Sequence, residues 1–178
     1  MRRLLALLPV LIAGCVAYSP ALDQKAAAKP GMAYLGGIFV DISTTLPKTT
    51  SLGVTYENLD TGVIHTFKFL KERQFQVLEV PPGSYRVKQW FMATMFNEAL
   101  VRGTPKTPLF QRQIKVAPGQ AYFVGEHTAT GTITHGGNVV YYNTQLQPKR
   151  ITPSADDQAA FAERYPNLGK LQLVRAYD

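Results

Sequence analysis

Short runs in which apolar residues alternate with small or polar ones recur along this sequence, and this pattern constrains the fold more than any other feature. Leu52, Val54 and Tyr56 form one such run, and Phe75 and Val77 belong to another. Because successive side chains of a strand point to opposite faces of a sheet, the runs predict half-buried strands. Eight or nine strands are expected, over residues 32–43, 51–58, 63–70, 74–80, 85–91, 110–116, 121–126, 139–146 and 170–177.

Turn signals separate these runs. Residues 58–62 combine Asn, Asp and Gly, residues 81–83 read Pro-Pro-Gly, and residues 116–120 again contain Pro and Gly. Thr134–Asn138 is a further turn of the hairpin type. Many short strands separated by regular turn signals predict a mainly β protein with an antiparallel β-sandwich.

The sequence changes character near its end. Thr152 or Ser154 is suited to cap a helix, and Asp156 and Asp157 follow where acidic residues favour a helix N-terminus. The next residues carry an apolar side, and Pro166 ends the pattern. One short C-terminal helix is expected over residues 153–165.

The turn at Val80–Arg86 resembles a motif of transthyretin-like and carboxypeptidase-regulatory-like sandwich domains. In those families a strand ends in a Pro-Gly turn that is followed by Tyr and by alternating residues, as at Tyr85 here. The resemblance covers about seven residues and implies a transthyretin-like or immunoglobulin-like sandwich. It implies no catalytic residue, because a shared fold does not carry a shared function.

The N-terminus has the three parts of a secretory signal peptide. Arg2 and Arg3 precede an apolar stretch from Leu4 to Ala13, and small residues follow before Cys15. The apolar stretch is shorter than the roughly 20 residues that a membrane-spanning helix needs. The sequence therefore predicts export and removal of residues 1–14.

Ile12-Ala13-Gly14-Cys15 resembles the lipobox of bacterial lipoproteins. The resemblance implies cleavage between Gly14 and Cys15, diacylglycerol on the Cys15 thiol and a further acyl chain, such as palmitate, on the new amino terminus. Val16 stands where Asp would retain a lipoprotein in the inner membrane, which favours the outer membrane of a Gram-negative bacterium. The alternative, a plain signal peptide, would leave an unpaired thiol in an oxidising compartment.

Three regions follow along the chain: residues 1–14 as signal peptide, residues 15–31 as lipidated Cys and flexible tether, and residues 32–178 as the sandwich domain. Without Arg2 and Arg3 the chain has 17 basic and 12 acidic residues, a net charge of +5. We expect the membrane as a partner through Cys15, together with a protein complex of the envelope. Nucleic acid is excluded as a partner of an exported protein.

No catalytic constellation is present in the sequence. Gly-x-Ser-x-Gly and His-Glu-x-x-His are absent, and one Cys excludes a Cys-rich zinc module. His127 and His135 could face each other across a hairpin, with Glu126 pointing the other way, but a structural zinc site needs about four ligands. These histidines are weak candidates only. We expect no metal, no cofactor and no enzyme activity.

A cationic and aromatic strip is the remaining candidate site. Alternation would place Arg86, Lys88 and Trp90 on one face of a strand, while the alternative interpretation buries Trp90 at the edge of the core. The candidate binding surface consists of Arg86, Lys88, Trp90, Met92, Met95 and Phe96.

These observations favour a lipoprotein that is anchored in the outer membrane, faces the periplasm and has a non-catalytic binding or structural role, above all protein interaction. The second hypothesis is a carbohydrate or small-ligand binding lipoprotein. It predicts Trp90 or Tyr142 exposed in a concave site beside polar groups. The third is an envelope enzyme or metal protein, in which Glu126, His127 and His135 would converge.

Overall fold

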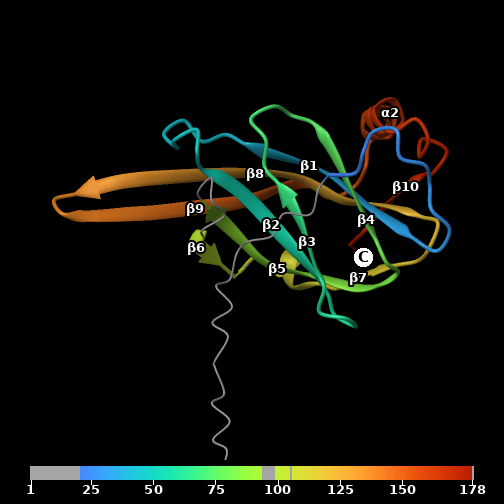
Figure 1. The fold of residues 1–178 in the computed structure, drawn as a ribbon, viewed down its shortest axis with the longest axis horizontal. Coiled ribbons are helices and arrows are strands. Elements are labelled where there is room, and N and C mark those ends of the chain that lie inside the picture. Colours follow the sequence, from blue (N-terminus) through green and yellow to red (C-terminus); the bar gives the residue numbers. More distant parts are fainter. Residues whose placement is uncertain (1–20, 94–98, 105, 178) are drawn as a thin grey trace, which may run out of the picture.

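Ten strands and two helices form the regular structure of the computed structural model, which describes residues 21–93, 99–104 and 106–177 (Figure 1). In chain order they are β1 (Ala33–Asp41), β2 (Ser51–Asn58), β3 (Ile64–Lys68), β4 (Phe75–Val80), β5 (Gly83–Ala93), β6 (Ala99–Gly103), α1 (Pro108–Gln111), β7 (Ile114–Val116), β8 (Ala121–Gly136), β9 (Val139–Arg150), α2 (Ala155–Arg164) and β10 (Leu173–Arg175).

The strands form two five-stranded sheets. Sheet A has the order β10-β8-β1-β4, with β9 also paired to β8, and sheet B has the order β3-β2-β5-β6, with β7 also paired to β5. The predicted mainly β, two-sheet architecture is confirmed. The prediction of antiparallel pairing is wrong for part of sheet A, because β8 runs parallel to β1 and to β10. These strands are far apart in the sequence, so no hairpin forces them to be antiparallel.

The main core lies between the two sheets. Leu35 and Val124 reach it from sheet A, and Val54 and Tyr85 reach it from sheet B. The alternation seen in the sequence has its cause here, since every second residue of these strands turns toward the other sheet. Burial of this apolar surface is the main force that holds the sheets together.

A second core lies on the outer face of sheet A, under α2. Phe161 and Tyr165 of the helix pack with Phe75 and Phe123 of the sheet. The helix occupies most of the predicted range 153–165, and of the two expected capping residues it is Ser154 that caps it. The Ser154 and Asp157 side chains each accept a hydrogen bond from the other's backbone N–H group, which forms a capping box.

Residues 21–31, which the sequence predicts as part of a flexible tether, contact the body at several points. The N–H of Leu22 donates to the carbonyl of Val77 at 3.0 Å, and Lys29 Nζ lies 2.7 Å from Glu79 Oε1. Asn167 Nδ2, just beyond α2, donates to the carbonyl of Lys25 at 2.7 Å. The chain from residue 22 to 29 is therefore held along β4 and α2. Residues 15–20 lie outside the described residues.

The predicted Pro-Pro-Gly turn joins β4 to β5. Gly83 has a φ of 149°, and a Cβ atom there would lie 2.8 Å from Asp60 Oδ2. A side chain at this position would therefore strain the backbone and displace Asp60. Tyr85 fixes the turn from the other end, since its hydroxyl donates to the carbonyl of Pro81 at 2.7 Å.

Candidate functional site

The candidate surface predicted around residues 86–96 is not contiguous in the structure. Arg86 and Lys88 are exposed, but Trp90 is partly buried and Met92 is fully buried. Met95 and Phe96 lie outside the described residues. The prediction of one shared surface is therefore wrong for Trp90 and Met92.

A β-bulge in β5 explains the difference. Thr55 of β2 pairs with Gln89, whereas Tyr56 pairs with Val87. Lys88 is therefore an extra residue in β5 that stands opposite no residue of β2. The bulge reverses the alternation beyond it. Trp90 then pairs with Val54, whose side chain lies in the main core, and its indole covers Gly103 of β6.

The two candidate histidines do not converge. Both lie on β8, because this strand continues to Gly136 instead of ending at residue 126. His127 and His135 are eight residues apart on the strand, which separates them by roughly 26 Å. His135 is exposed, whereas His127 is 1% exposed and stacks on Phe39 at a ring distance of 5.2 Å. Within the described ranges, no three His, Cys, Asp or Glu residues gather closely enough to hold a metal ion.

His127 is held neutral by its surroundings. Burial lowers the pKa of His127 to about 4, although its contact with the carbonyl of Val124 at 2.9 Å and the nearby Glu126 charge act in the opposite direction. Its Nδ1 atom is buried and makes no hydrogen bond. The ring therefore acts as a packing element between the sheets.

Glu126 points to the other side of sheet A, as predicted, and takes part in a network of two arginines and two acids. Arg73 Nε lies 3.1 Å from Glu126 Oε1, and Arg150 Nη2 lies 3.1 Å from Glu126 Oε2. Arg150 also pairs with both carboxylate oxygens of Asp157, with Nη2 at 2.6 Å from Oδ1. These contacts join β8, β9 and the start of α2 at one point.

The charges of this network cancel one another. Hydrogen bonds from Arg73, and then Arg150, lower the pKa of Glu126 despite its burial. For Asp157, burial raises the pKa, but hydrogen bonds from Arg150 and Ser154 outweigh this effect and the pKa is lowered. Both acids are thus ionised and paired, so neither is poised to transfer a proton. The network is a structural clamp.

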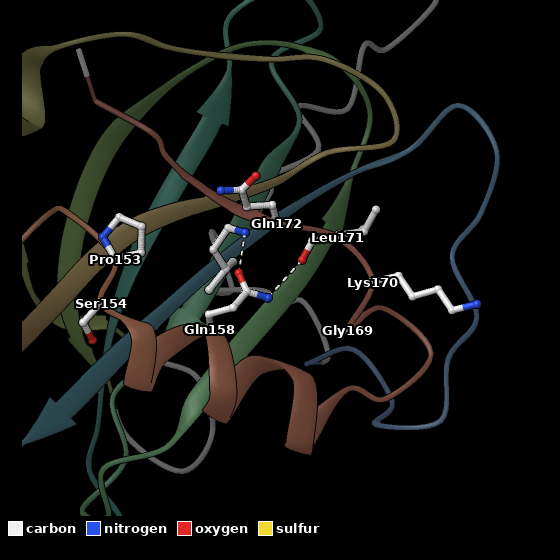
Figure 2. A pocket seen from close by; sticks show the side chains of 8 residues that line it. Pro153, Ser154, Gln158, Gly169, Lys170, Leu171 and Gln172 are labelled. Carbon is white, nitrogen blue, oxygen red and sulfur yellow. Dashed lines mark hydrogen bonds between the residues drawn. The ribbon is translucent and has the colours of Figure 1, made fainter.

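A depression between α2 and β10 offers little chemistry (Figure 2). It has a volume of about 390 Å³ and lies around Gln158. The Gln158 amide donates to the carbonyl of Leu171 at 3.1 Å and accepts from the N–H of Leu173 at 2.8 Å. Both ends of this amide are thus used to hold the last strand against the helix.

The feature that stands out is a long hairpin arm. We define the β8–β9 arm as residues 130–147. It begins where the pairing of β8 with β1 ends, after Ala129, and it ends at Gln147 of β9, which pairs with Thr128 at the base. The arm projects beyond the rest of the described fold (Figure 1). Its base is braced where Ser43 Oγ accepts from the N–H of Gly131 at 2.6 Å.

The arm is uncharged and exposes large apolar side chains. Residues 127–148 contain no Asp, Glu, Lys or Arg, which makes this the longest such run in the sequence. Val140, Tyr141 and Tyr142 are 39%, 57% and 40% exposed. Within the described ranges, β9 pairs with β8 alone, so its other edge presents open backbone groups.

A second feature is the concentration of positive charge in the segment that contains β5, β6, α1 and β7. The 34 residues from Gly83 to Val116 contain six basic residues and one acid, Glu98, a net charge of +5. This equals the net charge of the whole chain from Cys15 onward, so the remaining charges cancel. All six basic side chains are exposed. We call this surface the basic face: Arg86, Lys88, Arg102, Lys106, Arg112 and Lys115.

A groove opens on the basic face where α1 meets β5. It has a volume of about 530 Å³ and is lined by Arg86, Lys88, Thr104 and Gln111, among others. Lys88 Nζ lies 2.6 Å from Glu57 Oε1. Among the described residues Arg86 forms no ion pair. The groove is thus suited to anionic groups.

Neither the β8–β9 arm nor the basic face coincides with the binding surface that was predicted from the sequence. Arg86 and Lys88 belong to the basic face, but the arm contains none of the residues of the predicted surface. The signal that could have identified the arm is its uncharged run of 22 residues around Tyr141 and Tyr142. The lipidation and cleavage residues, Cys15 and Gly14, lie outside the described residues.

Comparison with known proteins gives no functional assignment. No protein family matches the sequence, and no curated protein matches it. One solved structure, a leucine-rich repeat protein from Bacteroides thetaiotaomicron, shares 12% identity over 71% of this chain, with a TM-score of 0.37. The aligned part spans 19% of that protein, and so weak a likeness supports no argument. In the part of the chain that the structure describes, neither helix is long and apolar enough to cross a membrane.

Proposed function

We propose that the protein is a lipoprotein of the Gram-negative cell envelope, anchored in the outer membrane through a lipid on Cys15 and facing the periplasm. Its role is the non-catalytic binding of a partner protein, and the β8–β9 arm is the docking element. The arm supports this proposal because it exposes an uncharged strand edge together with Val140, Tyr141 and Tyr142.

The open edge of β9 favours an extended partner segment that adds a strand to sheet A. Natural proteins usually protect such edges with charged residues or proline. Such protection is present at the base of β9, where Pro148, Lys149 and Arg150 stand, and is absent over residues 139–147. This contrast within one strand supports the docking role, since an edge left open can pair with another chain.

Each face of the arm carries one of the two exposed tyrosines. Ile133 and Leu146 face the main core side and rest partly against it. Tyr142 pairs with Ile133, so it lies on that same side, and Tyr141 lies on the opposite one. A partner strand along β9 would therefore contact one tyrosine on each face, and an exposed aromatic side chain is a frequent binding anchor.

The anchor is tested by the lipid on Cys15. Growth with a clickable palmitate analogue should label the native chain, and mass spectrometry should place diacylglycerol on the N-terminal cysteine of the mature protein. The Cys15→Ser variant should lose the label and leave the membrane fraction. An unlabelled chain that is cleaved at another position would refute the anchor.

The arm is tested by crosslinking in cells with a benzoyl-phenylalanine probe at Tyr141. The matched control carries the probe at Val63, which is 50% exposed in the turn between β2 and β3. We expect one defined protein adduct from Tyr141 and none from Val63. Adding Asn143→Lys and Gln145→Lys should abolish the adduct, because charges on an edge strand oppose strand addition.

The matched charge control is Val63→Lys with Ile64→Lys, which adds the same charge at another exposed apolar site. This variant should keep the Tyr141 adduct. Equal adducts from both probes, or an adduct that survives the arm lysines, would refute docking at the β8–β9 arm. A crosslink to a second copy of this chain would change the partner from another protein to the protein itself.

We further propose that the fold is a transthyretin-like or immunoglobulin-like sandwich. The hydrogen bond from the Tyr85 hydroxyl back to Pro81 supports this assignment. A tyrosine that bonds to the backbone a few residues upstream is a recurring corner in such sandwiches.

A further inference from the structure

A small cavity lies where the edges of the two sheets meet the end of α2. β3 is an edge strand of sheet B, and β4 is an edge strand of sheet A. The cavity has a volume of about 190 Å³ and is bordered by Thr66 and Lys68 of β3, by part of β4, and by Arg164, the last residue of α2. The described residues that line it include none of the β8–β9 arm. It is therefore a separate place on the molecule.

Hydrogen bonds fix the walls of this cavity. Gln76 Nε2 donates to the carbonyl of Lys68 at 2.7 Å, which joins β4 to β3. The N–H of Leu70 donates to the carbonyl of Phe39 at 3.1 Å, and the carbonyl of Leu70 accepts from the N–H of Asp41 at 2.7 Å. The cavity is thus preformed, so a ligand would not have to order its walls in order to bind.

Apolar residues form much of the wall and limit the kind of ligand. Leu70, Val77, Leu78 and Tyr165 all line the cavity. An apolar cavity of roughly 150 Å³ is large enough to hold benzene. A cavity of about 190 Å³ therefore has room for one ring or a short branched chain together with one small polar group.

Arg164 provides a hydrogen-bond donor without a partner at this cavity. Its Nε atom is buried and makes no hydrogen bond. A buried donor that lacks an acceptor destabilises a fold, and nearly all buried polar groups in native proteins are paired. The unpaired Nε–H group of Arg164 therefore points to an acceptor that a ligand would supply.

The charges around the cavity favour an anionic acceptor. Arg164 and Lys68 both border it, and the described residues that line it include no Asp or Glu. A guanidinium group presents its N–H donors as a planar fork that matches the two oxygens of a carboxylate. A carboxylate would therefore pair with Arg164 in charge and in geometry.

We propose that this cavity binds a small monocarboxylic acid whose body is one ring or a short branched chain. The carboxylate accepts from Arg164 Nε, and the apolar body lies against Leu70 and Tyr165. The ligand is a free acid and not the end of a peptide, because the cavity holds the apolar body and the carboxylate but leaves no room for a preceding peptide unit. This site depends neither on the β8–β9 arm nor on a lipid at Cys15.

The test uses the whole chain, purified in a nonionic detergent, and para-fluorobenzoate as the probe. Fluorine NMR relaxation measures binding of the probe, with the detergent alone as the blank. We expect saturable binding of one probe per chain. Para-fluorobenzamide has nearly the same shape without the charge and should bind at least about tenfold more weakly, because hydrogen bonds between charged groups are the stronger ones. Equal affinities, or no saturable binding of the acid, would overturn the proposal.

Two matched variants locate the site. Arg164→Gln should lower the affinity for para-fluorobenzoate at least about tenfold, because it removes the charged donor. Arg175→Gln makes the same change at an exposed position on β10 and should alter the affinity less than about twofold. Thermal unfolding checks that both variants are folded. Equal losses of affinity in the two variants would place the acid elsewhere and overturn the proposal.

A measurement on the native chain decides the matter even if Arg164→Gln does not fold. Nitrogen NMR resolves the Nε–H signals of arginine side chains, and the signal that disappears in Arg164→Lys belongs to Arg164. Addition of para-fluorobenzoate should shift this signal and leave that of Arg175 in place. An Arg164 signal that does not move at saturating probe would overturn the proposal.

Competition for the probe distinguishes a free acid from the end of a peptide. Isocaproate and N-acetyl-leucine carry the same branched chain and a carboxylate, but N-acetyl-leucine adds a peptide-like group. Isocaproate should displace para-fluorobenzoate at a concentration at least about tenfold lower, because the added amide would lose its hydrogen bonds to water in an apolar cavity. The reverse order would overturn the free acid as the ligand and assign the cavity to the C-terminus of a peptide.

Discussion

The hydroxyl groups of Tyr56 and Tyr177 meet 3.0 Å apart in the core between the two sheets. Tyr56 lies in the middle of sheet B, whereas Tyr177 follows β10 of sheet A, and both side chains are fully buried. Burial raises the pKa of both phenols. Each hydroxyl is thus the polar partner that the other needs, and together they tie the end of the chain into the core.

Replacing one member of this pair should cost more than replacing both. Tyr177→Phe leaves the Tyr56 hydroxyl buried without a partner, a loss of about 1–3 kcal/mol in the free energy of unfolding. The double variant with Tyr56→Phe should recover part of that loss, because no orphan hydroxyl remains. Denaturant unfolding of the four proteins measures the coupling, and strictly additive losses would show that the hydroxyls do not interact.

The strands could be predicted from the sequence wherever one of their faces is buried, because burial is what produces the alternation. The arm shows the limit of this rule. Residues 130–136 lie largely outside the core, so nothing requires alternation there, and the predicted strand ends at residue 126 while β8 continues to Gly136. The bulge at Lys88 leaves no signal in the sequence either, and it moves Trp90 to the other side of the strand.

The ion-pair network of the two arginines and two acids could not be predicted from the sequence, for a different reason. Arg73, Glu126 and Arg150 are separated by long stretches of sequence, and only the fold brings them together. Asp157 alone could be placed correctly at the start of a helix. Its pairing with Arg150 depends on how β9 leads into α2, which the local sequence does not specify.

Gly125 should be intolerant of any side chain. Its φ is 120°, and a Cβ atom would lie 2.8 Å from the carbonyl oxygen of Arg150 and 2.8 Å from His127 Nε2. Gly125→Ala therefore combines backbone strain with a clash, and we expect a loss of about 2–4 kcal/mol. Gly119→Ala is the control, since its φ is 72° but nothing lies within 4 Å. It should lose only about 1 kcal/mol. Equal losses in thermal unfolding would contradict the clash.

Arg150→Gln should weaken the contact between the base of the arm and α2, and so lower the free energy of unfolding. It removes one partner from Glu126 and the main partner from Asp157, and the side chain is only 31% exposed. We expect a loss of about 2 kcal/mol, below the 3–5 kcal/mol of a fully buried pair. Lys149→Gln makes the same charge change at an exposed neighbour and should cost less than about 0.5 kcal/mol.

The same variant has a pH signature. Glu126 and Asp157 have lowered pKa values in the folded protein, so their stabilising effect is present above the unfolded values near 4 and is lost as the pH falls through the folded ones. The stability difference between Arg150→Gln and the native chain should therefore shrink in acid. A difference that stays constant from neutral pH to pH 2 would show that lost packing, and not lost charge pairing, causes the effect.

Because of His127, the free energy of unfolding should decrease as the pH is lowered from 6.5 to 4. Its pKa is about 4 in the folded chain, and an unfolded histidine has a pKa near 6.5. Below pH 6.5 the unfolded chain binds a proton that the folded chain does not. The free energy of unfolding therefore decreases as the pH is lowered, by about 3 kcal/mol between pH 6.5 and pH 4. His127→Gln keeps a polar group for the carbonyl of Val124 and should flatten this slope. His135→Gln, at an exposed site on the arm, is the matched control for the same substitution. Urea unfolding from pH 6.5 to 4.5 avoids most of the carboxylate titration, and a slope that His127→Gln does not alter would assign the effect to other groups.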